Sequence, residues 1–310
     1  MERSQEPPLQ ALESLTGDKG ESWKEQGDAV LKFVHHEVWA FDAEWVPDPA
    51  TGRIAYGLPE EMPDEEVLNV MWREGGATDE DPRPYLKTAL CRVVSIAAVT
   101  RSQAPDGTVT LRLHSIPSEA DGNLSEAQIL DRFLTAVGKA QPQLVGFNSS
   151  GADLPILIQR GIARGLHQPL FCRRPERPWE GRDYFARNSD WSVDLKDVLG
   201  GWGRSTPSLH EMASSCGIPG KIDVDGGDVV DLWLAGDIRS IAAYNECDAL
   251  TTYLLWLRIA HFAGFISPEQ YRAEQDQLRS LLRKRVEEQG AGHLERFLDR
   301  WEANEKRNRD

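Results

Sequence analysis

Two carboxylates stand one residue apart in the segment Phe41-Asp42-Ala43-Glu44-Trp45. Side chains at positions i and i+2 of a strand point to the same face, so Asp42 and Glu44 would project together. Two adjacent carboxylates repel each other unless a positive charge lies between them, and hard oxygen ligands of this kind suit Mg²⁺ or Mn²⁺. The alternative is a solvated strand end, and this pair alone does not exclude it.

A second candidate lies where a short apolar run ends in a loop of small residues before Asp153. An aspartate at the start of a helix accepts hydrogen bonds from backbone N–H groups, and Pro155 in the first turn fits that role. Asn148, in the same loop, is either a turn former or a ligand contact. The sequence therefore leaves open whether this carboxylate caps a helix or binds a ligand.

Tyr244 and Asp248 form the third candidate, on a long apolar segment with helical periodicity. Residues four apart lie on one face of a helix, so the hydroxyl and the carboxylate would approach one site. An acid on a buried helix is costly unless it is paired or binds a metal. A partly exposed Asp248 beside a solvated Glu246 is the alternative.

The elements that must position these groups follow from the hydrophobic periodicity of the chain. In chain order we predict strands at 38–43, 91–100 and 108–114, a helix at 124–137, a strand at 144–147, and helices at 153–163, 209–216 and 238–262. The second and third strands surround the turn Pro105-Asp106-Gly107 and should form a hairpin. This order predicts a mixed sheet flanked by helices, in an α/β (α+β) fold.

We predict three parts in the chain. Residues 1–30 are polar and acidic and should form a mobile arm, residues 31–265 hold the folded domain, and 266–310 form a helical extension that packs on it. An acidic insertion at 47–88 interrupts the domain. Within it, residues 57–85 carry nine acids and two bases, which favours a solvated loop or insertion.

The composition limits the class of protein. The chain has 310 residues and a net charge of −15, which by itself predicts repulsion from nucleic acid. Its longest apolar runs are too short to span a membrane, and the polar start of the chain is unlike a secretory signal. Four cysteines lack zinc-site spacing, so we expect free thiols and a cytoplasmic location.

One segment opposes the acidic balance. Residues 160–187 carry seven arginines and three acids, with aromatic residues between them. Such a segment is typical of a surface that follows phosphates, or of a solvated arginine-rich loop. The arginines are Arg160, Arg164, Arg173, Arg174, Arg177, Arg182 and Arg187.

In combination the three carboxylate motifs resemble the DEDD exonuclease superfamily of DnaQ-like proteins, in its tyrosine-containing DEDDy subgroup. The closest resemblance is to predicted 3'-5' exonucleases related to the exonuclease domain of family B DNA polymerases. The segments 191–195 (Trp-Ser-Val-Asp-Leu) and 216–221 (Cys-Gly-Ile-Pro-Gly-Lys) resemble further motifs of that family, and the likeness covers roughly residues 36–260. Ala152 departs from the family, which usually has an aromatic residue there.

The resemblance implies a ribonuclease-H-like mixed sheet and a metal-dependent 3'-5' exonuclease that releases nucleoside 5'-monophosphates from single-stranded DNA. Asp42, Glu44, Asp153 and Asp248 would hold two divalent cations, Mg²⁺ or Mn²⁺. Tyr244 would hold the attacking water or help to deprotonate it.

The resemblance also implies contacts with the terminal nucleotide. These would come from Ala43, Trp45, Phe147 and Asn148, although each aromatic residue could instead belong to the core. Arg173 and Arg174 are the candidates for phosphate contacts in the arginine-rich segment. DNA is favoured over RNA as the substrate, and proofreading or repair would need a separate polymerase or repair partner. A 3'-5' exoribonuclease and a non-catalytic nucleic-acid-binding scaffold remain the alternatives.

Overall fold

The computed structural model describes residues 31–177, 180–186, 189–200, 206–220 and 228–307. The predicted arm at 1–30 and the candidate Arg187 lie outside the described residues. Among the helices of the described part, none is both long and apolar enough to cross a bilayer.

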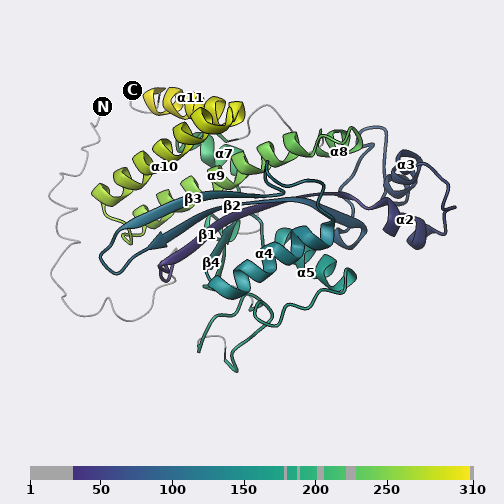
Figure 1. Ribbon diagram of the computed structural model, residues 1–310, viewed down its shortest axis with the longest axis horizontal. Coiled ribbons are helices and arrows are strands. Elements are labelled where there is room, and N and C mark those ends of the chain that lie inside the picture. Colours follow the sequence, from purple (N-terminus) through teal and green to yellow (C-terminus); the bar gives the residue numbers. More distant parts are fainter. Residues whose placement is uncertain (1–30, 178–179, 187–188, 201–205, 221–227, 308–310) are drawn as a thin grey trace, which may run out of the picture.

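A five-stranded mixed sheet forms the centre of the fold (Figure 1), in the order β3-β2-β1-β4-β5. The strands are β1 (Glu37–Pro47), β2 (Cys91–Gln103), β3 (Val109–Ile116), β4 (Gln143–Gly146) and β5 (Ser192–Asp194). The first three are antiparallel neighbours, while β4 and β5 run parallel to β1. The predicted hairpin and mixed sheet are therefore confirmed.

Helices cover both faces of the sheet (Figure 1). One face carries α4 (Glu126–Ala140) and α5 (Asp153–Ala163), and the other carries α7 (Leu209–Ser215), α9 (Ile238–Phe262), α10 (Pro268–Gln289) and α11 (Gly292–Arg307). The shorter elements are α2 (Pro49–Tyr56), α3 (Asp64–Glu74), η2 (Thr88–Leu90), α6 (Leu195–Val198) and α8 (Asp228–Leu234).

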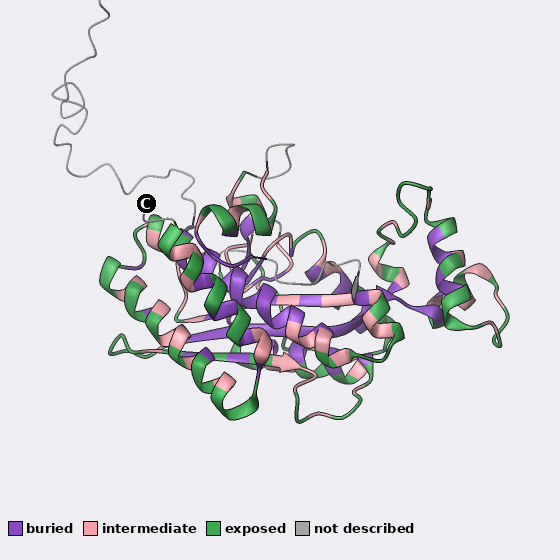
Figure 2. Ribbon diagram, turned by 90° about the horizontal axis from the view of Figure 1, so that it is seen from above, coloured by how far each residue is buried: buried purple, intermediate pink, exposed green. Residues whose placement is uncertain are grey.

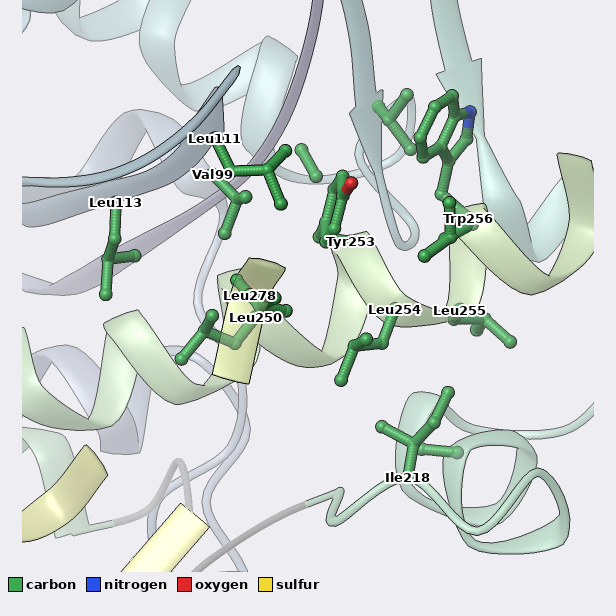
Figure 3. Packing of buried hydrophobic residues seen from close by; sticks show 14 of the residues in the cluster. Val99, Leu111, Leu113, Ile218, Leu250, Tyr253, Leu254, Leu255, Trp256 and Leu278 are labelled. Atoms are coloured by element: carbon green, nitrogen blue, oxygen red, sulfur yellow. The ribbon is translucent and has the colours of Figure 1, made fainter. Parts of the chain in front are cut away.

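The alternation of β1 divides the core between these two layers. Ala40 packs into the cluster on the α9 face, whereas Phe41 and Ala43 pack against α4 and α5. Buried residues gather where the helices meet the sheet (Figure 2), and the apolar residues of α9, among them Leu250 and Tyr253, face the strands (Figure 3). The even-numbered residues of β1 therefore face α9, and Asp42 and Glu44 belong to that series.

The acidic insertion is partly helical, so the interpretation of 57–85 as a loop is wrong for α3. Val67, Leu68, Met71 and Trp72 recur at helical spacing and form a small buried cluster. The acids Asp64, Glu65 and Glu66 occupy the first turn, where the helix dipole favours negative charge. The density of acids hid an amphipathic pattern of only four apolar residues.

The C-terminal helices α10 and α11 pack against the core cluster on the α9 face. Glu274 of α10 is buried and binds Arg101 of β2 through two hydrogen bonds of 2.8 and 2.9 Å. Tyr253 of α9 donates a third hydrogen bond to Glu274, at 2.9 Å. These contacts join the extension to the sheet and to the helix that carries Tyr244 and Asp248.

Candidate metal centre

Three carboxylates from distant parts of the chain meet between β1 and α9. Ligand oxygens of Asp42, Glu44 and Asp248 all lie within 4.8 Å of one another. Asp42 and Glu44 share one face of β1, and α9 brings Asp248 to that face from the opposite end of the sequence. Asp42 and Glu44 keep partial access to solvent, which an incoming ligand requires.

Asp153 reaches the same place from the start of α5. Its Oδ1 accepts a hydrogen bond of 3.1 Å from the backbone N–H of Ala43, the residue between Asp42 and Glu44. This N–H is available because β4 pairs with β1 only from Val38 to Ala40. The early end of β4 therefore leaves room for the aspartate, which is almost fully buried.

The loop that carries Asp153 is held by Asp194, at the end of β5. The carboxylate of Asp194 accepts hydrogen bonds from the backbone N–H groups of Asn148 and Ser150, at 2.7 and 2.9 Å. Asn148 adopts a positive φ of 61°, and its side chain accepts a hydrogen bond of 3.1 Å from Lys196. Asn148 thus serves as a turn former here, and a contact with nucleic acid stays a prediction.

The negative charges of the clustered carboxylates repel one another. Burial raises the pKa of Asp42 well above its ordinary value, and repulsion from Asp153, Glu44 and Asp248 raises it further. Burial also raises the pKa of Asp153 to about 7, despite the hydrogen bond from Ala43. A cluster of oxygen donors that resists ionisation in this way fits a divalent cation, whose charge would stabilise all of the carboxylates.

Tyr244 is buried beside the cluster, one helical turn before Asp248. Burial raises the pKa of its hydroxyl strongly, and the charges of Asp248, Glu44 and Asp42 act in the same direction. The hydroxyl also forms a hydrogen bond with Asp248, so in the metal-free protein it is held protonated next to the carboxylates.

The other predicted nucleotide contacts lie on both sides of the sheet. Phe147 packs on the α9 side, where the carboxylates lie. Ala43 and Trp45 pack against the cluster formed by α4 and α5, so their side chains face away from the carboxylates. Sequence reasoning placed Trp45 near the motif in the chain, and the alternation of the strand sends its ring to the other face.

The arginine-rich segment is not one exposed phosphate surface. Arg160 is almost fully buried and binds Asp48 and Glu126 at 2.6 and 2.8 Å, and Arg164 binds the same two acids. The phosphate interpretation is therefore wrong for Arg160 and Arg164, because buried carboxylates occupy their guanidinium groups.

Arg173 and Arg174 remain exposed in the same segment. Arg174 forms an ion pair of 2.9 Å with the buried Asp183, which fixes its position without removing it from solvent. Both arginines can still meet a phosphate at the surface, and that contact stays a prediction.

Two supporting residues near the centre were missed from the sequence. Asn245, next to Tyr244, is fully buried and donates a hydrogen bond of 3.4 Å to the carbonyl of Ser95, the residue opposite Glu44 in the sheet. Asp194 was noted within a motif, but its role as the anchor of the β4–α5 loop was not. Asp194 stands between the apolar residues Val193 and Leu195, which was a signal, whereas Asn245 is followed by Glu246 and Asp248 and carried none.

Comparison with known families agrees with this geometry. A model for a predicted 3'-5' exonuclease related to the exonuclease domain of PolB matches residues 83–301. The match includes Asp153, Tyr244 and Asp248, and it begins after Asp42 and Glu44, which the fold brings to the same centre. No curated protein matches the chain.

Proposed function

The chain belongs to the family of predicted 3'-5' exonucleases related to the exonuclease domain of PolB, and we propose that it hydrolyses single-stranded DNA from the 3' end. The observation that carries the proposal is the convergence of Asp42, Glu44 and Asp248 within 4.8 Å. The expected products are nucleoside 5'-monophosphates.

The four carboxylates would hold two divalent cations, Mg²⁺ or Mn²⁺. Three of them already converge, and Asp153 is fixed to the backbone between two of the others. When bound, the cations supply the positive charge that a phosphodiester needs to accept a nucleophile. The protein contributes a rigid set of ligands from β1, α5 and α9, so that the scissile phosphate is held in one orientation.

Tyr244 would act as a donor toward the water or the phosphate. Its hydroxyl would orient the attacking water, because a phenol with a raised pKa is a poor base. Phe147 would contact the terminal base from the same side of the sheet. For Ala43, the backbone rather than the side chain would contribute, because its N–H already orients Asp153.

The test is hydrolysis of end-labelled DNA and RNA strands of the same sequence, with free or blocked 3' ends and with Mg²⁺ or Mn²⁺. The wild-type chain should shorten the DNA strand stepwise from a free 3' end, and Asp42→Asn should not. Asp79→Asn is the matched control, because it removes an exposed carboxylate from the insertion.

Each result has a defined meaning. No metal-dependent shortening of either strand would refute the proposal and leave a non-catalytic scaffold. Shortening of the RNA strand alone would replace DNA by RNA as the substrate, with the same chemistry. Shortening of strands with a blocked 3' end would overturn the polarity.

A further inference from the structure

A groove of about 740 Å³ lies between α7 and α11, away from the carboxylates. In Figure 1, α7 lies beneath α11 and above the sheet. Among the described residues that line the groove, the basic side chains outnumber the acidic ones. The basic side chains are His210, Arg296, Arg300 and Arg307, and the acidic one is Asp299.

The three arginines of the groove form one stripe along α11. Arg296, Arg300 and Arg307 stand at positions i, i+4 and i+11, so they fall within about 40° of one another around the helix. They extend over about 16 Å of the helix axis. A row of guanidinium groups of this length matches an extended anionic chain better than a small anion.

Two acids of α11 are held away from the groove. Glu302 and Glu305 form ion pairs with arginines of α10, the first of them at 2.8 Å. Asp299 is the acid of α11 that lines the groove, beside three arginines of the same helix. The formal charge of the groove side of α11 is therefore positive, within a chain whose net charge is −15.

The opposite wall of the groove is the turn at 216–220, a motif that the proposed catalytic centre does not use. Gly217 and Pro219 line the groove, and the carbonyl of Ile218 accepts a hydrogen bond of 3.4 Å from Asn304 of α11. Gly220 has a φ of +67°, and a Cβ there would lie 2.6 Å from Nδ1 of His210. The turn is thus packed closely against both helices.

The turn also contacts the helix that carries the metal centre. Ile218 is buried against α9, near Leu254 and Leu255 (Figure 3). Arg258 of α9 donates a hydrogen bond of 3.1 Å to the carbonyl of Cys216. Arg258 follows Asp248 by ten residues, which corresponds to about 15 Å along the helix and about 80° around it.

We propose that this groove binds the phosphate backbone of the nucleic-acid strand whose 3' end lies at the carboxylates. The inference rests on the proposed function and assigns a substrate-binding role to α11 and to the turn at 216–220. Overall repulsion by an acidic protein must be overcome locally, and the row of arginines on α11, whose groove meets α9 through the turn at 216–220, supplies that attraction.

The test is the salt dependence of binding to a labelled single strand of about 20 nucleotides, long enough to span both sites. Binding is measured by fluorescence anisotropy in Ca²⁺, with the full chain and with Arg300→Gln/Arg307→Gln. Arg272→Gln/Lys284→Gln is the matched control, because it removes two exposed positive charges from α10.

The groove variant should bind with a salt slope shallower by about 1.4, since each contact with a single strand contributes about 0.7. When the salt concentration is raised from about 50 to about 200 mM, the ratio of the variant's Kd to the wild-type Kd should therefore fall about sevenfold. The control should keep the wild-type slope. A nucleoside 5'-monophosphate, too small to contact the carboxylates and the groove at the same time, should bind the groove variant and the wild-type chain equally.

An unchanged slope for the groove variant would overturn the proposal, and the groove would then fit an acidic protein partner. An equal change in both variants would also overturn it, because net charge alone would explain the result. Hydrolysis by the wild-type chain is measured separately. A changed slope without hydrolysis would keep the groove as a nucleic-acid surface and refute the proposed exonuclease.

Discussion

Replacing Asp153 by asparagine should stabilise the metal-free protein at alkaline pH while it abolishes the proposed hydrolysis. Asp153 is 4% exposed, and burial raises its pKa from 3.8 to about 7. Asparagine keeps the side-chain oxygen that accepts the hydrogen bond from Ala43. The substitution therefore removes the unfavourable charge and leaves the local geometry in place.

The size and sign of the effect follow from proton linkage. Between pH 3.8 and about 7, the folded protein keeps a proton on Asp153 that the unfolded chain releases, so the free energy of unfolding falls as pH rises. A pKa difference of about 3 units corresponds to about 4 kcal/mol. The asparagine side chain has no such proton. The advantage of Asp153→Asn should thus be absent below pH 3.8 and complete above about pH 7.

The assay is urea unfolding in EDTA at several pH values between about 4 and 8. Asp48→Asn is the mirror control. Burial raises the pKa of Asp48, but hydrogen bonds from Thr51 and Arg160 outweigh it and bring the pKa below its ordinary value. The stability supplied by Asp48 is present above its unfolded pKa and is lost as pH falls, so Asp48→Asn should be most harmful at alkaline pH.

A constant difference between Asp153→Asn and the wild-type chain at all pH values would refute the reasoning, because the effect would then not depend on ionisation. A variant that is less stable at pH 8 than the wild-type chain would refute it as well. Added Mg²⁺ should stabilise the wild-type chain at pH 8 and reduce the advantage of the variant, since cation binding requires the ionised carboxylate.

Three further substitutions test separate parts of the structure. Tyr244→Phe should lower kcat by about 10²–10³-fold without weakening Mn²⁺ binding measured by calorimetry, because the hydroxyl acts as a hydrogen-bond donor at the reaction centre and is not needed as a ligand. Asp194→Ala should cost about 1–3 kcal/mol in urea unfolding and speed hydrogen exchange in the β4–α5 loop, since three backbone N–H groups, two of them in that loop, lose their acceptor. Arg101→Met should cost about 3–5 kcal/mol by leaving the charge of Glu274 buried without its cation, and Arg101→Met/Glu274→Gln should recover part of that loss, since the amide is neutral and its oxygen still accepts the hydrogen bond from Tyr253.

The sequence predicted the helix and strand that carry the candidate centre. The range 238–262 coincides with α9, and the alternation around Asp42 and Glu44 matches the two faces of β1. Both predictions rest on local periodicity, which burial on one side of an element imposes directly. The approach of Asp248 to Asp42 was predicted from the family resemblance, because spacing within one element says nothing about its distance from another.

Contacts between residues that are far apart in the sequence explain the wrong interpretation of the arginines. Arg160 belonged to a segment interpreted as a phosphate surface or a solvated loop, but its partners Glu126 and Asp48 lie 34 and 112 residues away in the chain. These ion pairs could not be predicted from the sequence, because no local pattern distinguishes an arginine that is buried with two acids from an arginine in solvent. Helix α3 was missed for a different reason, since its four buried apolar residues stand in a segment dominated by acids.

The net charge of −15 and a nucleic-acid substrate are compatible because charges act locally. Salt screens exposed charges over about 10 Å at 0.1 M ionic strength. Helix α3, which carries several of these acids, lies at one end of the molecule and α11 lies toward the other (Figure 1), so the insertion contributes little to the field in the groove beside α11. At the centre itself, the raised pKa values of Asp42 and Asp153 favour the cation-bound state over four bare charges. A strand held by the arginines of α11 would then meet a centre whose charge is set by its bound cations. The net charge of the chain would affect binding of the strand mainly at low salt.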